Sequence, residues 1–175
     1  MNFENFATKA HLATVPADRS FCDSFGLRLN IPQVVAEIGH FIRMEPGFKY
    51  VVGVGTDSER IAGGNADFVT AIVIRRVGNG GRYFWKRKNC GPFHTLRDRI
   101  IQEALFSIET AGEVLSELKK VSDVDFNFEV HADIGMGGDT REMMNEVVGM
   151  IRAYNYEVKV KPESYAATNV ADRHV

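Results

Sequence analysis

The sequence predicts a single α/β domain in which helices pack on a mixed β-sheet. Three runs rich in β-branched and aromatic residues follow one another with short connections, at 50–58, 67–76 and 82–88, which predicts an antiparallel meander. Two later runs, at 126–135 and 156–162, each follow a helical segment, and strands separated by helices become parallel neighbours through right-handed crossovers. Together these runs predict a five-stranded mixed sheet, three strands in a meander and then two parallel strands, flanked by helices.

The composition limits the kinds of protein that this chain can be. Its 175 residues are 45% hydrophobic and 25% charged, as in a globular protein that builds its own core. The 21 basic and 23 acidic residues give a net charge of −2, which excludes a protein that coats nucleic acid non-specifically, so any nucleic-acid site has to be local. Cys22 and Cys90 are too few for a disulfide framework or a four-ligand zinc site.

The sequence carries no sign of export or of membrane insertion. Its first residues lack an apolar run behind a basic start, and no later stretch approaches the roughly 20 apolar residues that span a bilayer. The two cysteines fit a reducing compartment as free thiols. We therefore expect a cytoplasmic protein without membrane contact, and the pattern leaves its oligomeric state open.

The first half of the chain divides into an arm, a helix and the meander. Residues 1–30 are polar and lack periodicity, which predicts an irregular arm before a single domain at 31–175. From Ile31 onward apolar residues recur at helical spacing behind Asn30, a candidate N-cap. The dipeptide Asn79-Gly80 predicts a hairpin between the second and third strands.

The second half alternates helices and strands. Residues 95–120 carry an apolar stripe at helical spacing and predict the longest helix. In 139–155, Asp139 and Glu142 have capping-box spacing at the start of another helix. The segment 164–175 is rich in alanine and predicts a final helix.

Two aspartates end strands that the expected strand order makes neighbours. Asp57 closes the first strand and Asp133 the fourth, so their carboxylates would face each other across the sheet. An unpaired buried carboxylate is costly, and Gly53 and Gly55 would let a ligand or a backbone approach closely, which favours a site. The alternative is that both acids hydrogen-bond to the backbone at strand ends. His131 lies on the same face as Asp133, and it either tunes such a site or is a satisfied core residue.

The long helix and the final helix each offer one further acid. At roughly 100° per residue, Glu103 lies closest to the edge of the apolar stripe, so it is the acid of that helix most able to reach the sheet. Asp98 is the fallback because it is nearer the helix start. The alanines of the final helix allow close packing against the sheet, which would bring Asp172 inward. For both Glu103 and Asp172 the alternative is a solvated helix charge.

Two other segments have features of contacts to nucleic acid or nucleotides. The strand RYFWKRK (82–88) mixes rings for stacking with charges for a phosphate backbone, so Trp85, Arg87 and Lys88 are candidate nucleic-acid contacts. An edge strand protected by its charges explains the same pattern. The glycine-rich turn GMGGDT (135–140) could present N–H groups to a phosphate, but it matches neither phosphate-binding motif.

Several motifs resemble those of the YkuK-type family of bacterial proteins, a family described as ribonuclease H-like. They are VGTDSE around Asp57, LRDRIIQEALFSIETA around Glu103, HADIG around Asp133, EVVGMI, and KPESYAATNVADRHV with Asp172. The resemblance covers most of residues 20–175; at Glu59 the family often has glutamine. It implies a ribonuclease H-like fold, which has the strand order expected above, with acids on the first strand, the first main helix, the fourth strand and the last helix.

The leading hypothesis is a metal-dependent nuclease that acts on RNA, DNA or a hybrid. Mg²⁺ and Mn²⁺ take oxygen ligands, and two such ions need at least about three or four carboxylates. Asp57 would bridge two Mg²⁺ or Mn²⁺ ions, Glu103 and Asp133 would hold one of them and Asp172 the other, which makes these acids the candidate catalytic and metal-binding residues. The alternative is a non-catalytic ribonuclease H-like module that binds nucleic acid or protein. Nucleotide handling, by analogy with the related sheets of actin-like ATPases, is a third hypothesis.

Overall fold

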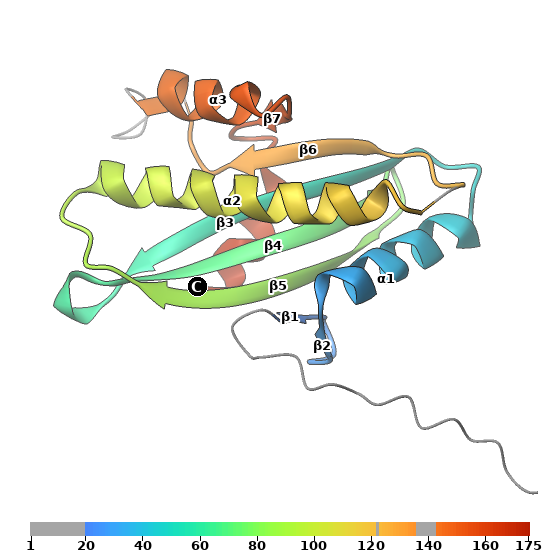
Figure 1. Cartoon of the computed structure of the whole chain (residues 1–175), viewed down its shortest axis with the longest axis horizontal. Helices are drawn as coiled ribbons and strands as arrows, with labels where there is room; N and C mark the ends of the chain where they lie inside the picture. Colours follow the sequence, from blue (N-terminus) through green and yellow to red (C-terminus); the bar gives the residue numbers. More distant parts are fainter. Residues whose placement is uncertain (1–19, 122, 136–142) are drawn as a thin grey trace, which may run out of the picture.

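The computed structural model describes residues 20–121, 123–135 and 143–175, and the statements below concern these residues. A twisted central sheet separates two layers (Figure 1). The helices α1 (Ile31–Met44) and α2 (Leu96–Leu118) cover one face of the sheet. The other face is covered by η4 (Ala166–Ala171), which packs on the middle strands of the sheet.

The sheet has seven strands in the order β2-β1-β5-β4-β3-β6-β7. The strands β3, β4 and β5 form the antiparallel meander, and β6 and β7 continue the sheet in parallel from β3. This confirms the expected meander and the parallel pair. The bounds are β1 (Phe21–Cys22), β2 (Arg28–Leu29), β3 (Tyr50–Arg60), β4 (Ala66–Arg76), β5 (Gly81–Cys90), β6 (Asn127–Ala132) and β7 (Glu157–Lys159).

The expected number of five strands is wrong, because β1 and β2 lie within the segment expected to be irregular. Each has two residues, which is too short for the alternation that identifies a strand in a sequence. Their hairpin is closed by Asp23, whose Oδ1 accepts hydrogen bonds from the backbone N–H groups of Phe25 and Leu27 at 2.8 Å. β1 extends the sheet beyond β5 by pairing Cys22 with Trp85.

The helices begin where side chains can satisfy their free backbone groups. Asn30 caps α1 and exchanges side-chain hydrogen bonds with Gln33, as the sequence predicts for this N-cap. Thr95 caps α2 in the same way with Asp98. The helix α3 covers Met144–Ala153; the expected capping pair Asp139 and Glu142 lies outside the described residues.

The chain ends in a different kind of helix from the one expected. η4 is a wide turn of π type, in which the backbone N–H of Asp172 donates to the carbonyl of Ala167. A single tight turn, η5 (Asp172–His174), follows. The alanine-rich run at 164–175 gives helical propensity but does not specify the hydrogen-bond pattern, which here follows the sheet beneath it.

A short tight turn, η2 (Ala62–Gly64), links β3 to β4.

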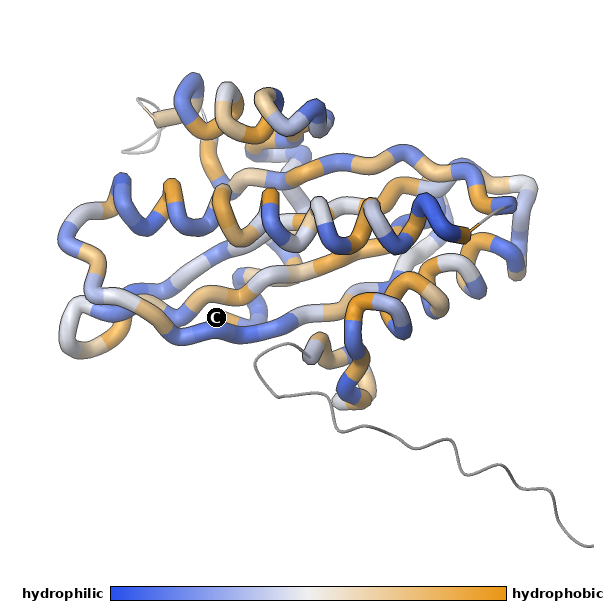
Figure 2. The backbone as a smooth tube through the Cα atoms, viewed as in Figure 1, coloured by the Kyte–Doolittle hydropathy of each residue, from blue (hydrophilic) through white to orange (hydrophobic). Residues whose placement is uncertain are grey.

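Two apolar clusters hold the layers together. The larger cluster lies between the sheet and α1 and α2, where Ile38, Val54, Ile72 and Ile108 are all buried. Figure 2 shows why these helices pack this way: apolar positions recur along α1 and α2 with hydrophilic positions between them. The smaller cluster lies under η4 and contains Val69, Ala71 and Ala171, with Trp85 at its margin.

Two glycines of β3 allow close packing on the η4 face. A Cβ atom at Gly55 would lie 2.7 Å from the backbone N of Ala167, and one at Gly53 would lie 2.7 Å from the ring Cε1 of His131. Neither distance is tolerable for real atoms, so β3 needs glycine at both positions. The close approach expected here is therefore made by the protein's own backbone and imidazole.

Candidate functional site

Three acids gather on the η4 face, where β6 ends beside the last part of β3. The parallel register pairs Thr56 with Ala132, so Asp57, within β3, and Asp133, directly after β6, occupy the next positions along neighbouring chains. Asp57 shares a face with Gly55 because side chains alternate along a strand. Asp133 reaches η4, where Thr168 Oγ1 donates to its Oδ1 at 2.7 Å. Asp172 is exposed at the start of η5, near enough for its charge to raise the pKa of Asp57.

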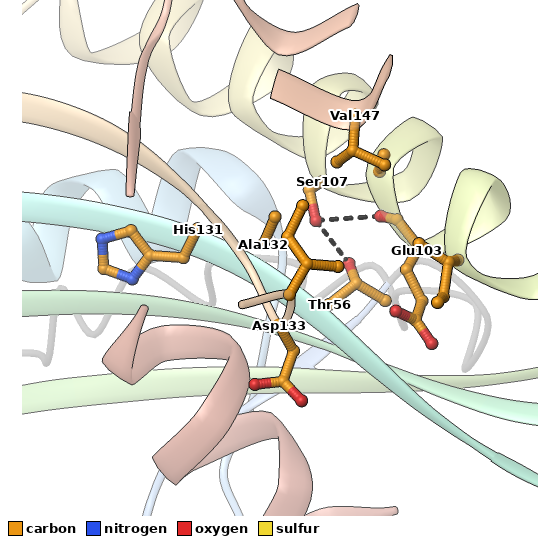
Figure 3. A pocket seen from close by; sticks show the side chains of 10 residues that line it. Thr56, Glu103, Ser107, His131, Ala132, Asp133 and Val147 are labelled. Carbon is orange, nitrogen blue, oxygen red and sulfur yellow. Dashed lines mark hydrogen bonds between the residues drawn. The ribbon is translucent and has the colours of Figure 1, made fainter. Parts of the chain in front are cut away.

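Glu103 reaches the same end of the sheet from α2. It is only 7% exposed, and its Oε1 accepts a hydrogen bond of 2.5 Å from Ser58 Oγ. One helical turn further on, Ser107 Oγ lies 3.0 Å from Thr56 Oγ1 and 2.9 Å from the carbonyl oxygen of Glu103. Figure 3 shows the two bonds of Ser107, with the side chains of Glu103, from α2, and Asp133, from the end of β6, beside them.

The groups around the acids leave little open space. A cavity of about 10 Å³ is lined by Thr56, Glu103, Ser107, His131 and Asp133 among others, which is room for one water at most. Asp133 is engaged by the ammonium of Lys161, with Nζ 2.9 Å from its Oδ2. Among the described residues, no three His, Cys, Asp or Glu side chains lie at the spacing of a metal site. In this structure Glu103 and Asp133 are therefore bound by other groups of the chain, Glu103 by Ser58 and Asp133 by Thr168 and Lys161.

Burial raises the pKa of two of the acids. The pKa of Asp57 rises to about 6, first because it is desolvated and then because Asp133 and Asp172 are near; the backbone N–H of Ser58 and the Arg99 charge oppose the rise. The pKa of Glu103 rises to about 8, again mainly by burial, against the hydrogen bond from Ser58. Repulsion between carboxylates therefore contributes, but removal from water contributes more.

These shifts predict that the metal-free protein loses stability as the pH rises. The unfolded chain gives up the Glu103 proton above its ordinary pKa of 4.5, whereas the folded chain keeps it to about 8, so the free energy of unfolding falls through that window. We expect the melting temperature in EDTA to be lower at pH 8 than at pH 5, by roughly 5 °C or more from this group. Glu103→Gln should flatten the dependence. A variant with the wild-type slope would contradict the assignment.

His131 and Asp98 have structural roles. His131 is fully buried; its Nδ1 accepts from the Ala166 N–H at 3.0 Å, and its Nε2 lies 3.1 Å from Glu129 Oε2. It therefore fastens the start of η4 to β6 as a satisfied core residue. Asp98 Oδ2 accepts from the backbone N–H of Thr95, so this fallback acid completes the α2 cap.

The candidate nucleic-acid contacts lie on two different faces of β5. Trp85 and Arg87 share the η4 face: the indole stacks on His174 with ring centroids 4.3 Å apart, and Arg87 pairs with Asp67 at 3.2 Å and donates to the carbonyl of His174. Lys88 is on the α2 face, over the ring of Phe106. The alternative of a charged edge strand also fits, because β5 pairs with β1 at only one position.

Four residues around the acids were not singled out from the sequence. Ser58 and Arg99 hold the Glu103 side of the site, with Arg99 Nη1 3.1 Å from Ser58 Oγ. Lys161 and Thr168 hold Asp133. Of these four, Arg99 carries a usable signal, because it lies one helical turn before Glu103. Lys161 and Thr168 carry none, because their contacts depend on the path of the last segment.

Across the part of the chain that the structure describes, no helix is long and apolar enough to cross a bilayer.

Comparisons with known proteins identify the family of this chain. The chain is 32% identical over 157 residues to "Uncharacterized protein YkuK" of Bacillus subtilis (strain 168), covering 83% of this chain and 91% of that protein. No solved structure matches the chain. The family model described as "Ribonuclease H-like" matches residues 33–175, and the chain therefore belongs to the ribonuclease H-like family.

Proposed function

We propose that this protein is a metal-dependent nuclease that hydrolyses nucleic-acid phosphodiester bonds where β6 ends beside β3. The observation that carries the proposal is the parallel pairing of these strands, because it brings Asp57 and Asp133 from distant parts of the sequence to neighbouring positions. Family membership supports a function related to nucleic acid. Glu103 and Asp172 come to the same end of the sheet from two further elements.

The donor set at this end fits a hard divalent cation. All four acids offer carboxylate oxygens, the ligands that Mg²⁺ and Mn²⁺ prefer. The raised pKa of Asp57 comes from burial and from neighbouring acids, and positive charge placed among these groups relieves both effects. A pair of such ions held by these acids would lower the pKa of the attacking water and stabilise the leaving oxygen.

The chain's own residues prepare this site in different ways. Asp57 would bind metal from β3, and Glu103 would bind it from α2 once Ser58 no longer donates its hydrogen bond. In this structure the Lys161 ammonium is paired with Asp133. A metal ion bound at Asp133 would take the place of that ammonium. Asp172 is exposed and would close the site from the η4 face.

A cleavage panel tests the proposal. The protein is incubated with single-stranded RNA, single-stranded DNA, an RNA–DNA hybrid and branched DNA, each in Mg²⁺, Mn²⁺ or EDTA. We expect at least one substrate to be cut with Mg²⁺ or Mn²⁺ and none in EDTA. Absence of cleavage on every substrate would contradict the proposal, and ATP hydrolysis without cleavage would favour nucleotide handling instead.

The second candidate is a non-catalytic module of the same fold. It is favoured by the absence, among the described residues, of three metal-ligating side chains at ligand spacing, and by the Lys161 contact to Asp133. Such a module would bind through Trp85, Arg87 or Lys88. It predicts nucleic-acid or protein binding that a chelator does not change, and a melting temperature that Mn²⁺ does not raise.

A further inference from the structure

A second hollow lies beside the acid cluster, at the first turn of α2. It has a volume of about 180 Å³, smaller than the clefts of about 300–1,000 Å³ that hold drug-sized ligands. Its walls come from the end of β3, the β3–β4 turn, the segment after β5 and the start of α2. The residues that matter for its chemistry are Arg60, Asn65, Phe93, Thr95 and Arg99.

The hollow continues a row of polar contacts between α2 and β3. Ser107 meets Thr56, and one helical turn earlier Glu103 meets Ser58. One turn earlier again, Arg99 reaches the same Ser58 from the other side. Arg60 is two residues beyond Ser58 on the same face of β3. Ser58 therefore connects Arg99, which lines the hollow, to Glu103.

The charge of this hollow is positive. Arg60 and Arg99 both line it, and no carboxylate from the described part of the chain does. Within the described residues neither arginine forms an ion pair with a carboxylate at 4.0 Å or less, in contrast to Arg87 and Arg97. A guanidinium presents its donors in a planar fork that matches phosphate oxygens. Two of them balance a phosphate monoester, which carries about −1.5 to −2 near neutral pH, better than a diester with its single charge.

We propose that this hollow binds a phosphate monoester at the end of a nucleic-acid strand. The bound end lies across Ser58 from Glu103, the acid of the site that lies on the α2 face of the sheet, so we expect a phosphodiester bond close to that end to be cut. This inference rests on the proposed nuclease function and gives its substrate class: strands that end in a phosphate, cut near the phosphorylated end.

Binding without metal tests the pocket separately from catalysis. In EDTA, the affinity for one oligonucleotide is measured with a 5′-phosphate, with a 3′-phosphate and with hydroxyl ends, by fluorescence anisotropy. We expect one phosphorylated form to bind about tenfold more tightly than the hydroxyl form, a difference of about 1.4 kcal/mol. Arg60→Gln should abolish that difference. Arg152→Gln, at an exposed site on α3, is the matched control and should retain it.

Each arm of the experiment decides a separate point. Equal affinity for all three oligonucleotides, or an unchanged preference in Arg60→Gln, would overturn the pocket assignment. A nucleoside monophosphate that binds as tightly as the phosphorylated strand would overturn the assignment to a strand end. A phosphate preference in a protein that cuts nothing in Mg²⁺ or Mn²⁺ would retain the pocket and refute the nuclease. Cleavage without any preference for a phosphorylated end would retain the nuclease and refute the pocket.

Discussion

Asp57→Asn is expected to lower metal-dependent cleavage by about a thousandfold or more. A metal ion contributes several kcal/mol of charge stabilisation in such reactions, and each loss of about 1.36 kcal/mol costs a factor of ten in rate. Asparagine keeps the size of Asp57 but removes the charge that we propose holds the metal between β3 and β6. The measurement is the single-turnover rate on the best substrate of the panel.

The stability of the same variant separates a lost metal ligand from a lost fold. Burial raises the pKa of Asp57 to about 6, so at pH 7 to 8 the folded protein carries an unfavourable charge that asparagine lacks. The variant should melt no lower than the wild type in EDTA and gain less from Mn²⁺. Asp125→Asn is the control. Asp125 is exposed and lies just before the start of β6, away from the acids, so this variant should cleave at the wild-type rate. Full activity in Asp57→Asn would refute the assigned role.

Gly55→Ala is expected to have the largest effect on stability. Its added methyl would lie 2.7 Å from the backbone N and 3.1 Å from the Cα of Ala167, and backbone atoms cannot swing aside as a flexible side chain does. Overpacking of this kind costs about 1–3 kcal/mol, or roughly 2–10 °C in melting temperature for a chain of this size. Because η4 would be pushed from the sheet, Thr168 and Asp172 would move with it, so activity should fall further than stability alone explains.

Gly149→Ala is the matched control for that variant. Gly149 lies inside α3, and a Cβ there meets nothing within 4 Å. Alanine in a helix interior is favoured over glycine by about 0.5–1 kcal/mol, so this variant should melt at the wild-type temperature or slightly above. If the two alanine variants melted alike, the close packing of η4 on β3 would be wrong.

The central architecture could be predicted because its elements are long enough to leave a pattern in the sequence. The meander and the first parallel strand could be predicted because β3 to β6 are long enough to show β-branched runs or alternation, and because α1 and α2 carry apolar stripes. The second parallel strand, expected over 156–162, is present only as β7 (Glu157–Lys159). Short elements carry no such pattern. The strands at Phe21–Cys22 and Arg28–Leu29 depend on one aspartate that bonds two backbone N–H groups. The π turn of η4 depends on the sheet that it packs against.

The acids of the site were accessible to sequence reasoning to different degrees. Asp57 and Asp133 could be placed side by side from strand order alone, because parallel strands end at the same edge. Glu103 could be ranked above other acids of its helix from its place beside the apolar stripe. Their partners Ser58 and Lys161 could not be predicted, because these contacts depend on which atoms the folded chain brings within reach. Gly53 and Gly55 of β3 make room for η4 and His131 rather than for a ligand.

A crystal soaked in Mn²⁺ tests the proposed site most directly. Anomalous scattering locates manganese independently of any assumption about ligands. We expect two peaks about 4 Å apart at the end of β3 and β6, within coordination distance of Asp57, Glu103 and Asp133, with Asp172 on the η4 side and Lys161 moved away from Asp133. Lys161 still paired with Asp133 and no manganese at these acids, at concentrations that support cleavage, would contradict the two-metal nuclease.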